Sequence, residues 1–264
     1  SIEEMGLQPE HSHHESGPGQ NEVCFRYAPA VKSADNLNTF KSAVKAIAAR
    51  NGLYASFMPK PLHDQSGNGL HVNMSLMRDG KNLFESPLTP DSEAGYFVAG
   101  ILAHARELTA FCNPVPNSYA RLGANEAPLY ISWSRQNRSQ LVRLPSASGD
   151  LCRVELRGPD PAGNPYLVIG LILAAGLDGI ARKLPLAEPV NRNLFHPSAA
   201  AGLESLPRTL REAITVAAQS DFIAAELPLA LQNKYFEYQT QLCHGYENAP
   251  DPAVWERTHG FLVI

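Results

Sequence analysis

The stretch from residue 153 to residue 157, Arg-Val-Glu-Leu-Arg, restricts the folds that this chain can adopt. Side chains along a β-strand alternate between its two faces, so Arg153, Glu155 and Arg157 would share one face and the two aliphatic side chains the other. The aliphatic face needs a covering layer, whereas the polar face places two cations beside a carboxylate. A solvated sheet face also alternates in this way. Other segments must therefore decide whether the polar face is an ordinary surface or a site.

Three further segments place uncommon polar side chains on one side of a short predicted strand. His71 and Ser75 share the polar side of one such strand, and Arg143 stands among aliphatic neighbours in another. Glu22 follows a glycine-rich approach, seven residues after Glu15. Mg2+ prefers oxygen ligands, Mn2+ also accepts imidazole, and arginine binds phosphate through two parallel hydrogen bonds. Together these segments predict a sheet that lines a metal-nucleotide site.

Three histidines, His11, His13 and His14, come just before Glu15. They could ligate a metal, but clustered histidines ahead of a glycine-rich loop are more often exposed or only near the ligands. Glu15 and Glu22 are therefore the preferred ligand candidates in this segment.

The spacing of apolar residues predicts helices that pack on a core, the first over residues 34–50 with Asp35 able to cap its start. Asn164 is predicted to cap a later helix that begins with Pro165, because proline is tolerated at the first helical position. Further helices are predicted at 92–111, 208–219 and 228–244, and the helix from Pro165 is expected to end near residue 183. Short strands are predicted at 53–58, 129–133, 141–144 and 153–157.

The composition excludes several classes of protein. With 264 residues, 44% hydrophobic and 18% charged, the chain has an ordinary globular composition, and its net charge of -4 argues against a nucleic-acid partner. The longest apolar run, residues 166–177, has 12 residues, against roughly 18 for a membrane span, and no signal peptide is visible. Four widely spaced cysteines indicate neither a disulfide framework nor a zinc knuckle, which favours a cytoplasmic location. The first residue is a serine, so we expect the beginning of the protein to be missing.

Taken together, six segments resemble glutamine synthetase of the bacterial type. The likeness runs in order from about Glu10 to Arg182 and fades toward the C-terminus. The matching segments are His13–Glu22, Phe57–Pro61, Gly67–His71, Asn117–Arg121, Asn137–Arg143 and Arg153–Pro161.

The resemblance implies an α+β catalytic domain over residues 1–264, with a mainly antiparallel, curved sheet that lines a funnel and is backed by helices. The N-terminal β-grasp domain of the family, and the Glu-x-Glu strand that supplies further metal ligands, have no counterpart in this sequence. In the family, ATP phosphorylates the side chain of L-glutamate and ammonia then displaces phosphate. Two or more Mg2+ or Mn2+ ions per site and a ring-shaped homo-oligomer, a dodecamer, are also implied.

The resemblance assigns a role to each matching residue. Metal ligands are implied at Glu15, Glu22, His71 and Glu155. Arg121 and Arg157, with the backbone of Gly67, are implied to hold the amino-acid substrate and the transferred phosphoryl group, and Glu126 is implied to shield the intermediate and accept a proton from ammonium. ATP contacts are implied at Ser75, Arg138, Arg143 and Arg153.

The sequence also departs from the family pattern. The connection from Arg121 to Glu126 is one residue shorter than usual, Asn73 and Ser66 replace residues common in the family, and Phe195 stands where some members carry a modifiable tyrosine. The short connection keeps open a second hypothesis, ligation of glutamate to an amine or polyamine. A third hypothesis is a nucleotide-binding homologue that no longer catalyses, against which the retained carboxylates and arginines argue.

Overall fold

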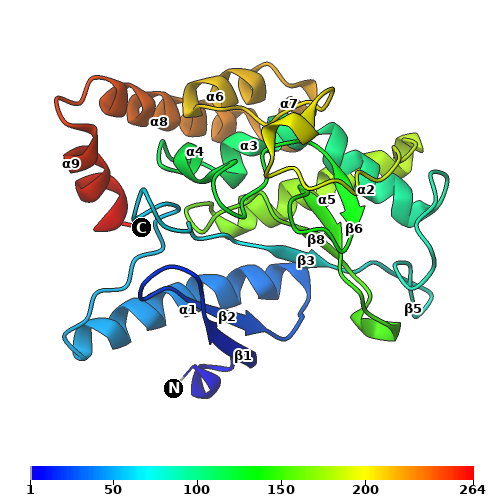
Figure 1. The fold of residues 1–264 in the computed structure, drawn as a ribbon, viewed down its shortest axis with the longest axis horizontal. Helices are drawn as coiled ribbons and strands as arrows, with labels where there is room; N and C mark the ends of the chain where they lie inside the picture. The colour runs from blue at the N-terminus through cyan, green and yellow to red at the C-terminus, as the bar shows by residue number, and fades with distance from the viewer. Residues whose placement is uncertain (1) are drawn as a thin grey trace.

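The computed structural model describes residues 2–264, except for the side chain of Pro197, and has an α+β fold in which helices cover small, mainly antiparallel sheets (Figure 1). The central sheet has the order β3-β8-β7-β6, with β3 at Val72–Met74, β8 at Val154–Leu156, β7 at Val142–Leu144 and β6 at Trp133–Arg135. β8 is antiparallel to both of its neighbours, and β6 is parallel to β7. The predicted fold class is confirmed.

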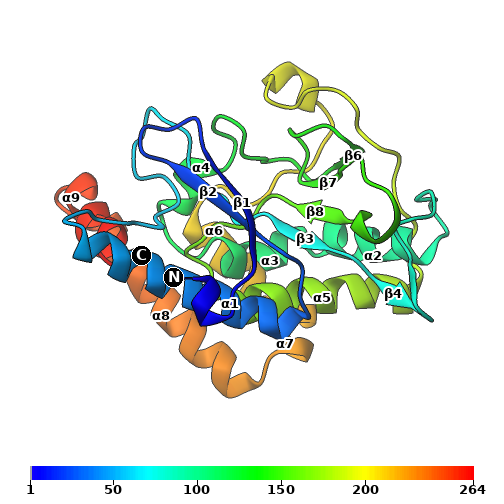
Figure 2. The ribbon, with the colours of Figure 1, turned by 90° about the horizontal axis from the view of Figure 1, so that it is seen from below.

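Two smaller sheets flank the central one. β1 (Pro9–His14) pairs with β2 (Asn21–Phe25) in an antiparallel hairpin, and β4 (Met77–Arg78) pairs with β5 (Lys81–Asn82). Seen from below, helices α1, α5 and α8 form one side of the molecule and the strands form the other (Figure 2). The α-helices are α1 (Ala30–Arg50), α2 (Glu93–Ala103), α3 (Ala105–Cys112), α4 (Ser118–Arg121), α5 (Pro165–Arg182), α6 (Leu210–Ala218), α7 (Asp221–Glu226), α8 (Leu229–Glu247) and α9 (Pro252–Glu256).

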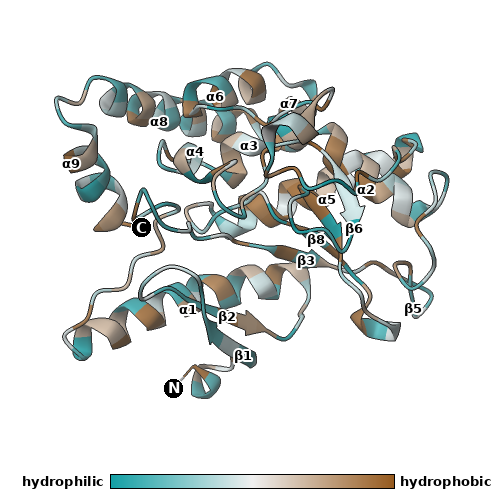
Figure 3. Cartoon of the chain, viewed as in Figure 1, coloured by the Kyte–Doolittle hydropathy of each residue, from teal (hydrophilic) through white to brown (hydrophobic). Residues whose placement is uncertain are grey.

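The core lies where α2 and α5 pack behind the central sheet. Phe97, Ile172 and Val154 are fully buried there, one from each layer. Brown, hydrophobic segments of α2, α5 and β8 accordingly gather in this part of the molecule (Figure 3). The two helices can approach closely because glycines meet at their crossing: a Cβ built on Gly179 would lie 2.6 Å from the Cα of Gly100.

Helix α5 is apolar because it lies in this core. By length and composition it could cross a membrane, the only such helix within residues 2–264. It packs instead against α1, α2 and α3, and Val168, Leu171 and Ile172 are buried in the core. Its start is fixed as predicted, because the side chain of Asn164 accepts hydrogen bonds from two backbone N–H groups of the first turn.

Four predictions of local structure were wrong. α1 begins at Ala30, so Asp35 lies inside the helix, where its carboxylate accepts a 2.6 Å hydrogen bond from the hydroxyl of Tyr166. The helix predicted over 92–111 is divided at His104. Residues 53–58 form no strand, and residues 129–132 form only an isolated bridge, between Tyr130 and Ser205, before β6 begins.

Residues 53–58 are held instead by the C-terminal turn. The backbone oxygen of Phe261 accepts hydrogen bonds from Tyr54 Oη at 3.1 Å and Ser56 Oγ at 3.0 Å. Lys45 of α1 donates to the backbone oxygen of Val263 at 2.9 Å. The C-terminal residues thus pack on the segment that leads into Gly67 and β3.

Candidate active site

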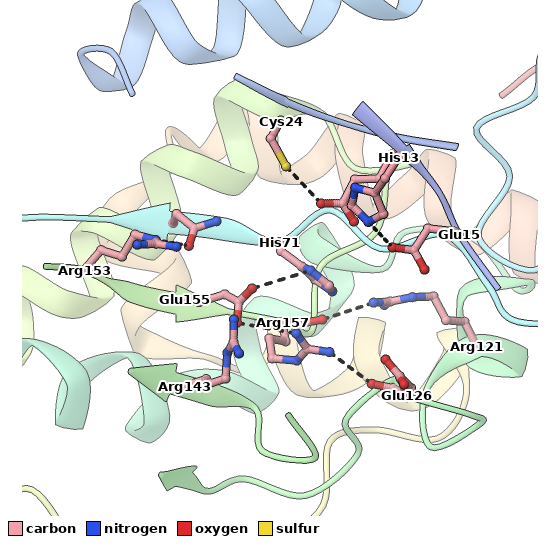
Figure 4. Close-up of polar contacts among 12 residues, drawn as sticks. His13, Glu15, Cys24, His71, Arg121, Glu126, Arg143, Arg153, Glu155 and Arg157 are labelled. Carbon is pink, nitrogen blue, oxygen red and sulfur yellow. Dashed lines mark hydrogen bonds and ion pairs between the residues drawn. The ribbon is translucent and has the colours of Figure 1, made fainter. Parts of the chain in front are cut away.

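Glu155 is the centre of the polar face of the central sheet. It is only 5% exposed, and its partners across the sheet are Asn73 on β3 and Arg143 on β7. One carboxylate oxygen accepts from Arg143 Nε at 2.5 Å and lies 3.4 Å from Arg157 Nη1, while the other lies 3.6 Å from His71 Nδ1 (Figure 4). The predicted alternation of residues 153–157 is confirmed, because the polar side chains gather on one face.

These contacts set the charge states around Glu155. Burial raises the pKa of Glu155, but its electrostatic interactions with His71, Arg157 and Arg143, and the hydrogen bond from Arg143, lower it more, so the net shift is downward. Burial and the nearby cations lower the pKa of His71 to about 3. At neutral pH the site therefore offers an ionised carboxylate and a neutral imidazole, which are the forms that bind metal ions.

A second group of metal donors lies on the β1–β2 hairpin. Donor atoms of His13, Glu15 and Glu22 all lie within 4.8 Å of one another. Burial raises the pKa of Glu15, yet hydrogen bonds, chiefly from His13 at 2.9 Å, bring it below its usual range. Two carboxylates and one imidazole are a donor set that suits Mg2+ or Mn2+. The predicted pair Glu15 and Glu22 is brought together.

His13 was not among the predicted ligands. Its position could have been found from the hairpin, since the turn between the strands places His13 opposite Glu22. Directly opposite residues in an antiparallel pair project to the same side. Along β2, the thiol of Cys24 also donates to Glu22 Oε1 at 3.1 Å, and burial together with Glu22 raises the pKa of Cys24 to about 12.

The loop before β3 connects the hairpin to the sheet. Gln20 Nε2 donates to the backbone oxygen of Gly67 at 3.1 Å and to Asn68 Oδ1 at 2.8 Å. A Cβ on Gly67 would lie 2.6 Å from the backbone oxygen of Pro59, and one on Gly69 would lie 2.9 Å from His71 Nε2. The backbone contact makes glycine necessary at position 67, whereas a side chain at position 69 would press on the ends of the Arg121 and His71 side chains, so the loop backbone passes directly beside the site.

Arg121 is buried beneath this loop. It is 2% exposed, and its terminal nitrogens donate to the backbone oxygens of Gly158 at 2.7 Å and Arg157 at 3.1 Å. Burial lowers its pKa to about 10, although the buried carboxylate of Asp160 opposes that shift. In this arrangement Arg121 holds the backbone carbonyl groups of Arg157 and Gly158 in place. Its predicted contact with substrate remains a prediction.

Arg157 has unused hydrogen-bonding capacity. Its Nη2 donates to the backbone oxygen of Glu126 at 3.4 Å, and its Nε is buried without a hydrogen-bond partner among the described residues. A buried donor without a partner is costly and is commonly explained by a ligand or solvent that the protein must bind. This observation fits an anionic substrate group at Arg157.

The remaining predicted residues lie farther from Glu155. Arg153 donates to Asn73 Oδ1 at 2.9 Å at the exposed edge of the sheet. Ser75, Glu126 and Arg138 are exposed, and within residues 2–264 the side chains of Ser75 and Arg138 make no hydrogen bond. The structure therefore brings Glu155, His71, Arg143 and Arg157 into one cluster but leaves Ser75 and Arg138 outside it.

An open hollow of about 660 Å3 adjoins the hairpin. Arg153 Nη1 donates to the backbone oxygen of Leu151, which lines this hollow, at 3.1 Å. The lining residues are Glu3, Leu7, Gln8, Pro9, Glu10, Arg26, Tyr27, Asp150 and Leu151. The hollow offers an aromatic ring and acceptor groups beside an arginine.

Comparisons with known proteins agree with this geometry. A family model described as "Glutamine synthetase, catalytic domain" matches residues 1–258. A glutamine synthetase of Methanosarcina mazei is 51% identical over 235 residues, covering 86% of this chain and 53% of that protein. One from Staphylococcus aureus strain MW2 is 46% identical over 242 residues, covering 89% and 54%. The chain thus spans about half the length of the curated relatives it matches.

Solved structures give the same result. A structure named "GmaS/ADP complex-Conformation 1" has a TM-score of 0.86 and 34% identity, covering 98% of this chain and 61% of that one. Another, "Apo GmaS without ligand", has a TM-score of 0.86 and 35% identity, covering 97% and 60%. The matches in sequence and in structure, together with the paired clusters of carboxylates, imidazoles and arginines, show that the chain belongs to the glutamine synthetase catalytic-domain family.

Proposed function

We propose that this chain is the catalytic part of an ATP-dependent ligase that joins ammonia to L-glutamate, giving glutamine, ADP and phosphate. The observation that carries the proposal is the cluster of Glu155, His71, Arg143 and Arg157 beside the carboxylate hairpin (Figure 4). A γ-glutamyl phosphate carries several negative charges, and fixed cations and metal ions are what stabilise such a group during transfer.

Each donor cluster has a proposed role. Glu15 and Glu22, with His13 beside them, would hold one divalent cation, and His71 and Glu155 would hold another. When bound, Mg2+ or Mn2+ supplies charge neutralisation for the phosphates. The ionised carboxylates and neutral imidazole described above are already in the protonation states that such ions require.

The arginines have proposed roles in orientation. Arg157, with its unused Nε, would hold the reacting carboxylate and phosphoryl group, and Arg143 fixes Glu155 while facing the same space. Arg153 and Arg138 would contact the nucleotide phosphates, and Ser75 would contact the nucleoside. Because Arg153 donates a hydrogen bond to Leu151, which lines the hollow beside the hairpin, we propose that the base of ATP occupies that hollow.

The loop from Arg121 to Glu126 would close over the intermediate. Arg121 secures the backbone at Arg157, and the backbone oxygen of Glu126 accepts from the Arg157 side chain. Asn125, in a left-handed conformation with φ of 52°, donates to the backbone oxygen of Gln65 at 2.8 Å. Glu126 would then exclude water from the acyl phosphate and accept a proton from ammonium.

The short connection at this loop favours one alternative, an amine or polyamine as the acceptor. In either case we propose a cytoplasmic enzyme that assembles into a dodecameric ring and has neither nucleic acid nor membrane as a partner. The ring matters for the mechanism because a neighbouring subunit would complete the funnel.

The proposal is tested with the full-length protein. Phosphate release is measured with ATP, Mg2+ and glutamate, using ammonia, methylamine or putrescine as acceptor. We expect the highest kcat/KM with ammonia; a preference for either amine would instead support the alternative. The absence of glutamate-dependent phosphate release with every acceptor would instead favour the nucleotide-binding homologue that no longer catalyses, and the proposal would fail.

A further inference from the structure

The 121–127 loop, which carries Glu126, is folded into two consecutive turns. The N–H of Ala124 donates to the backbone oxygen of Arg121 at 3.0 Å, and the N–H of Ala127 donates to that of Ala124 at 3.1 Å. Next to Ala124, the backbone is left-handed, with φ of 52° at residue 125. That residue is an asparagine, which adopts this conformation more readily than most residues with a side chain. The loop therefore has a compact shape of its own.

The side chain of Asn125 joins the 121–127 loop to the loop that carries Gly67. Its Nδ2 donates to the backbone oxygen of Gln65 at 2.8 Å. Lys60 Nζ donates to the same oxygen. A carbonyl oxygen has two lone pairs and can accept both hydrogen bonds. The oxygen of Gln65 thus connects the two loops through two side-chain donors.

The Lys60 end of this junction is firmly anchored. Lys60 is 3% exposed, and the amide of Asn117 binds both polar groups of its backbone, accepting from the N–H at 2.6 Å and donating to the carbonyl at 3.1 Å. Asn117 also donates to the buried carboxylate of Glu256 on α9 at 3.0 Å. Buried polar groups whose hydrogen bonds are satisfied hold one arrangement. Asn125, which is exposed, is therefore bonded to a fixed support.

This support sets the position of Glu126, the next residue after Asn125. The backbone oxygen of Glu126 also accepts from Arg157 Nη2, but at 3.4 Å, which is long for a hydrogen bond. The 2.8 Å bond from Asn125 is the better of the two contacts. Both contacts lie within the chain, so the chain itself holds Glu126 beside Arg157.

We propose that Asn125 is a positioning residue, a latch between the two loops that keeps Glu126 at the site. The latch rests on the contacts above, and only its effect on the reaction rests on the proposed function. A latched loop excludes water from the acyl phosphate, so that ammonia displaces the phosphate. Without the latch, water attacks instead, and the acyl phosphate and water give glutamate and phosphate. ATP is then consumed without formation of an amide bond.

The latch is tested first by hydrogen exchange of the 121–127 loop in the full-length protein, read by mass spectrometry. Asn125→Asp keeps the shape and the left-handed backbone but replaces the donor with an acceptor, and Asn125→Gly removes the amide without adding charge. We expect the loop to exchange about 2- to 10-fold faster in both variants, as the loss of one hydrogen bond implies. Gln65→Ala is the matched control, because the latch uses only the backbone oxygen of that residue.

The Gln65→Ala protein should exchange like the unsubstituted one. Circular dichroism and the melting temperature establish that the variants fold. Unchanged exchange in both Asn125 variants, or the same acceleration in Gln65→Ala, would overturn the latch.

The effect on the reaction is tested by the ratio of products. Phosphate and amide product are measured in the full-length protein with ATP, Mg2+, glutamate and the preferred acceptor. We expect equal amounts of both in the unsubstituted protein and in Gln65→Ala, and a glutamate-dependent excess of phosphate in both Asn125 variants. A protein that is merely less stable loses both products together and keeps the ratio.

The outcomes separate the latch from the proposed function. If the Asn125 variants exchange faster but form phosphate and amide in equal amounts, the latch does not control water and its effect on the reaction is refuted. If the unsubstituted protein releases no glutamate-dependent phosphate, the proposed function fails, and the exchange measurement still decides the latch.

Discussion

At the scale of single residues, Glu155 connects the stability of the site to its chemistry. Its carboxylate is the shared partner of Arg143, Arg157 and His71, all on or beside the central sheet. Removal of one partner from a buried ion pair commonly costs about 3–5 kcal/mol, because the other charge stays buried. The effect of a substitution at Glu155 on stability thus depends on whether the new side chain still accepts hydrogen bonds from Arg143 and Arg157.

We therefore expect Glu155→Gln to separate the two effects. The amide keeps an acceptor oxygen for Arg143 but loses the charge of a metal ligand, so turnover in the full-length enzyme should fall about 10-fold or more while the protein still folds. Glu155→Ala should lower turnover and the melting temperature together. The measurements are phosphate release at several Mg2+ concentrations and thermal unfolding. Near-normal turnover of Glu155→Gln at ordinary Mg2+ would contradict the ligand assignment.

Phe195 leads to a prediction about regulation. It is 37% exposed in the loop after residue 190, where some family members carry a modifiable tyrosine. A phenyl ring has no hydroxyl nucleophile, so we expect no nucleotidyl group to be added at this position. Incubation with an adenylylating enzyme and ATP, followed by peptide mass mapping, checks this, with Phe195→Tyr as the positive control. AMP mapped to Phe195 itself would contradict the prediction.

Some site residues could be predicted from the sequence because their signal is local. Alternation over residues 153–157 was enough to place Glu155 on a polar face, and Gly67 belongs to a loop where close backbone approach requires glycine. His13 was ranked below Glu15 and Glu22 because its place opposite Glu22 depends on strand register, which no single segment reveals. The buried position of Arg121 also could not be predicted, because it is set by backbone oxygens 36 and 37 residues away.

At the scale of elements, helices α2 and α5 approach each other closely where they cross in the core. Gly100 and Gly179 face each other there without side chains between them. We expect Gly179→Ala to destabilise the chain by about 1–3 kcal/mol, because the methyl group forces the helices apart. Gly170→Ala on the same helix is the matched control, since a Cβ there meets nothing within 4 Å, and it should stabilise by about 0.5–1 kcal/mol.

Urea unfolding of both variants measures the difference. The change in the free energy of unfolding should have opposite signs for Gly170→Ala and Gly179→Ala. Equal effects at Gly170 and Gly179 would mean that helix propensity, rather than the crossing, decides the outcome.

The division between α2 and α3 is stabilised by polar contacts of one imidazole. His104 lies at the break, and its Nε2 is 2.8 Å from Asp178 of α5, which also accepts from Arg182 at 3.0 Å. The other ring nitrogen contacts Glu107. Burial raises the pKa of Asp178, but the bonds from His104 and Arg182 lower it more. A carboxylate with a lowered pKa stabilises the fold above its unfolded pKa, and this contribution is lost as the pH falls through its folded value.

Asp178→Asn should therefore destabilise the chain at pH 7. The difference from the unsubstituted protein should narrow below about pH 4, where the unfolded carboxyl begins to bind protons. Melting temperatures measured from pH 3 to pH 7 check the sign. An offset of the same size at both ends of this range would rule out the charge of Asp178 as its cause.

Helices and strands could be predicted where the apolar pattern and the cap agree over a continuous segment. They could not be predicted where contacts with distant residues determine the local structure. The helix from Pro165 was predicted because the Asn164 cap and a long apolar face agree. Residues 53–58 have a strand-like composition but face Phe261 rather than a neighbouring strand. The start of α1 was misplaced because Asp35, a plausible cap, instead bonds to Tyr166, a contact that the sequence does not reveal.

At the scale of the whole molecule, we expect the proposed site to need more ligands than these residues offer. Five residues, His13, Glu15, Glu22, His71 and Glu155, offer protein ligands for two cations, and hard cations prefer about six or more oxygen donors. In the ring implied for the full-length protein, a neighbouring subunit would cover the funnel. Water would reach the acyl phosphate without that cover.

We therefore expect this chain alone to fold cooperatively but to make no glutamine. Its core is of normal size, so thermal unfolding should show a single transition. Titration with Mg2+ or Mn2+ and ATP should show weak binding, measured by calorimetry. Glutamine formation by the chain alone, detected by mass spectrometry, would refute the view that its site needs further ligands and cover.

The contacts of the C-terminal turn have a consequence for synthesis on the ribosome. Phe261 is bonded to residues that precede it by more than 200 positions, and Val263 is bonded to Lys45 of α1. During translation, residues 53–58 emerge long before their partners and have no strand to pair with. This early segment, which leads directly to the loop of Gly67, must wait for residues 261–263 before it acquires its native contacts.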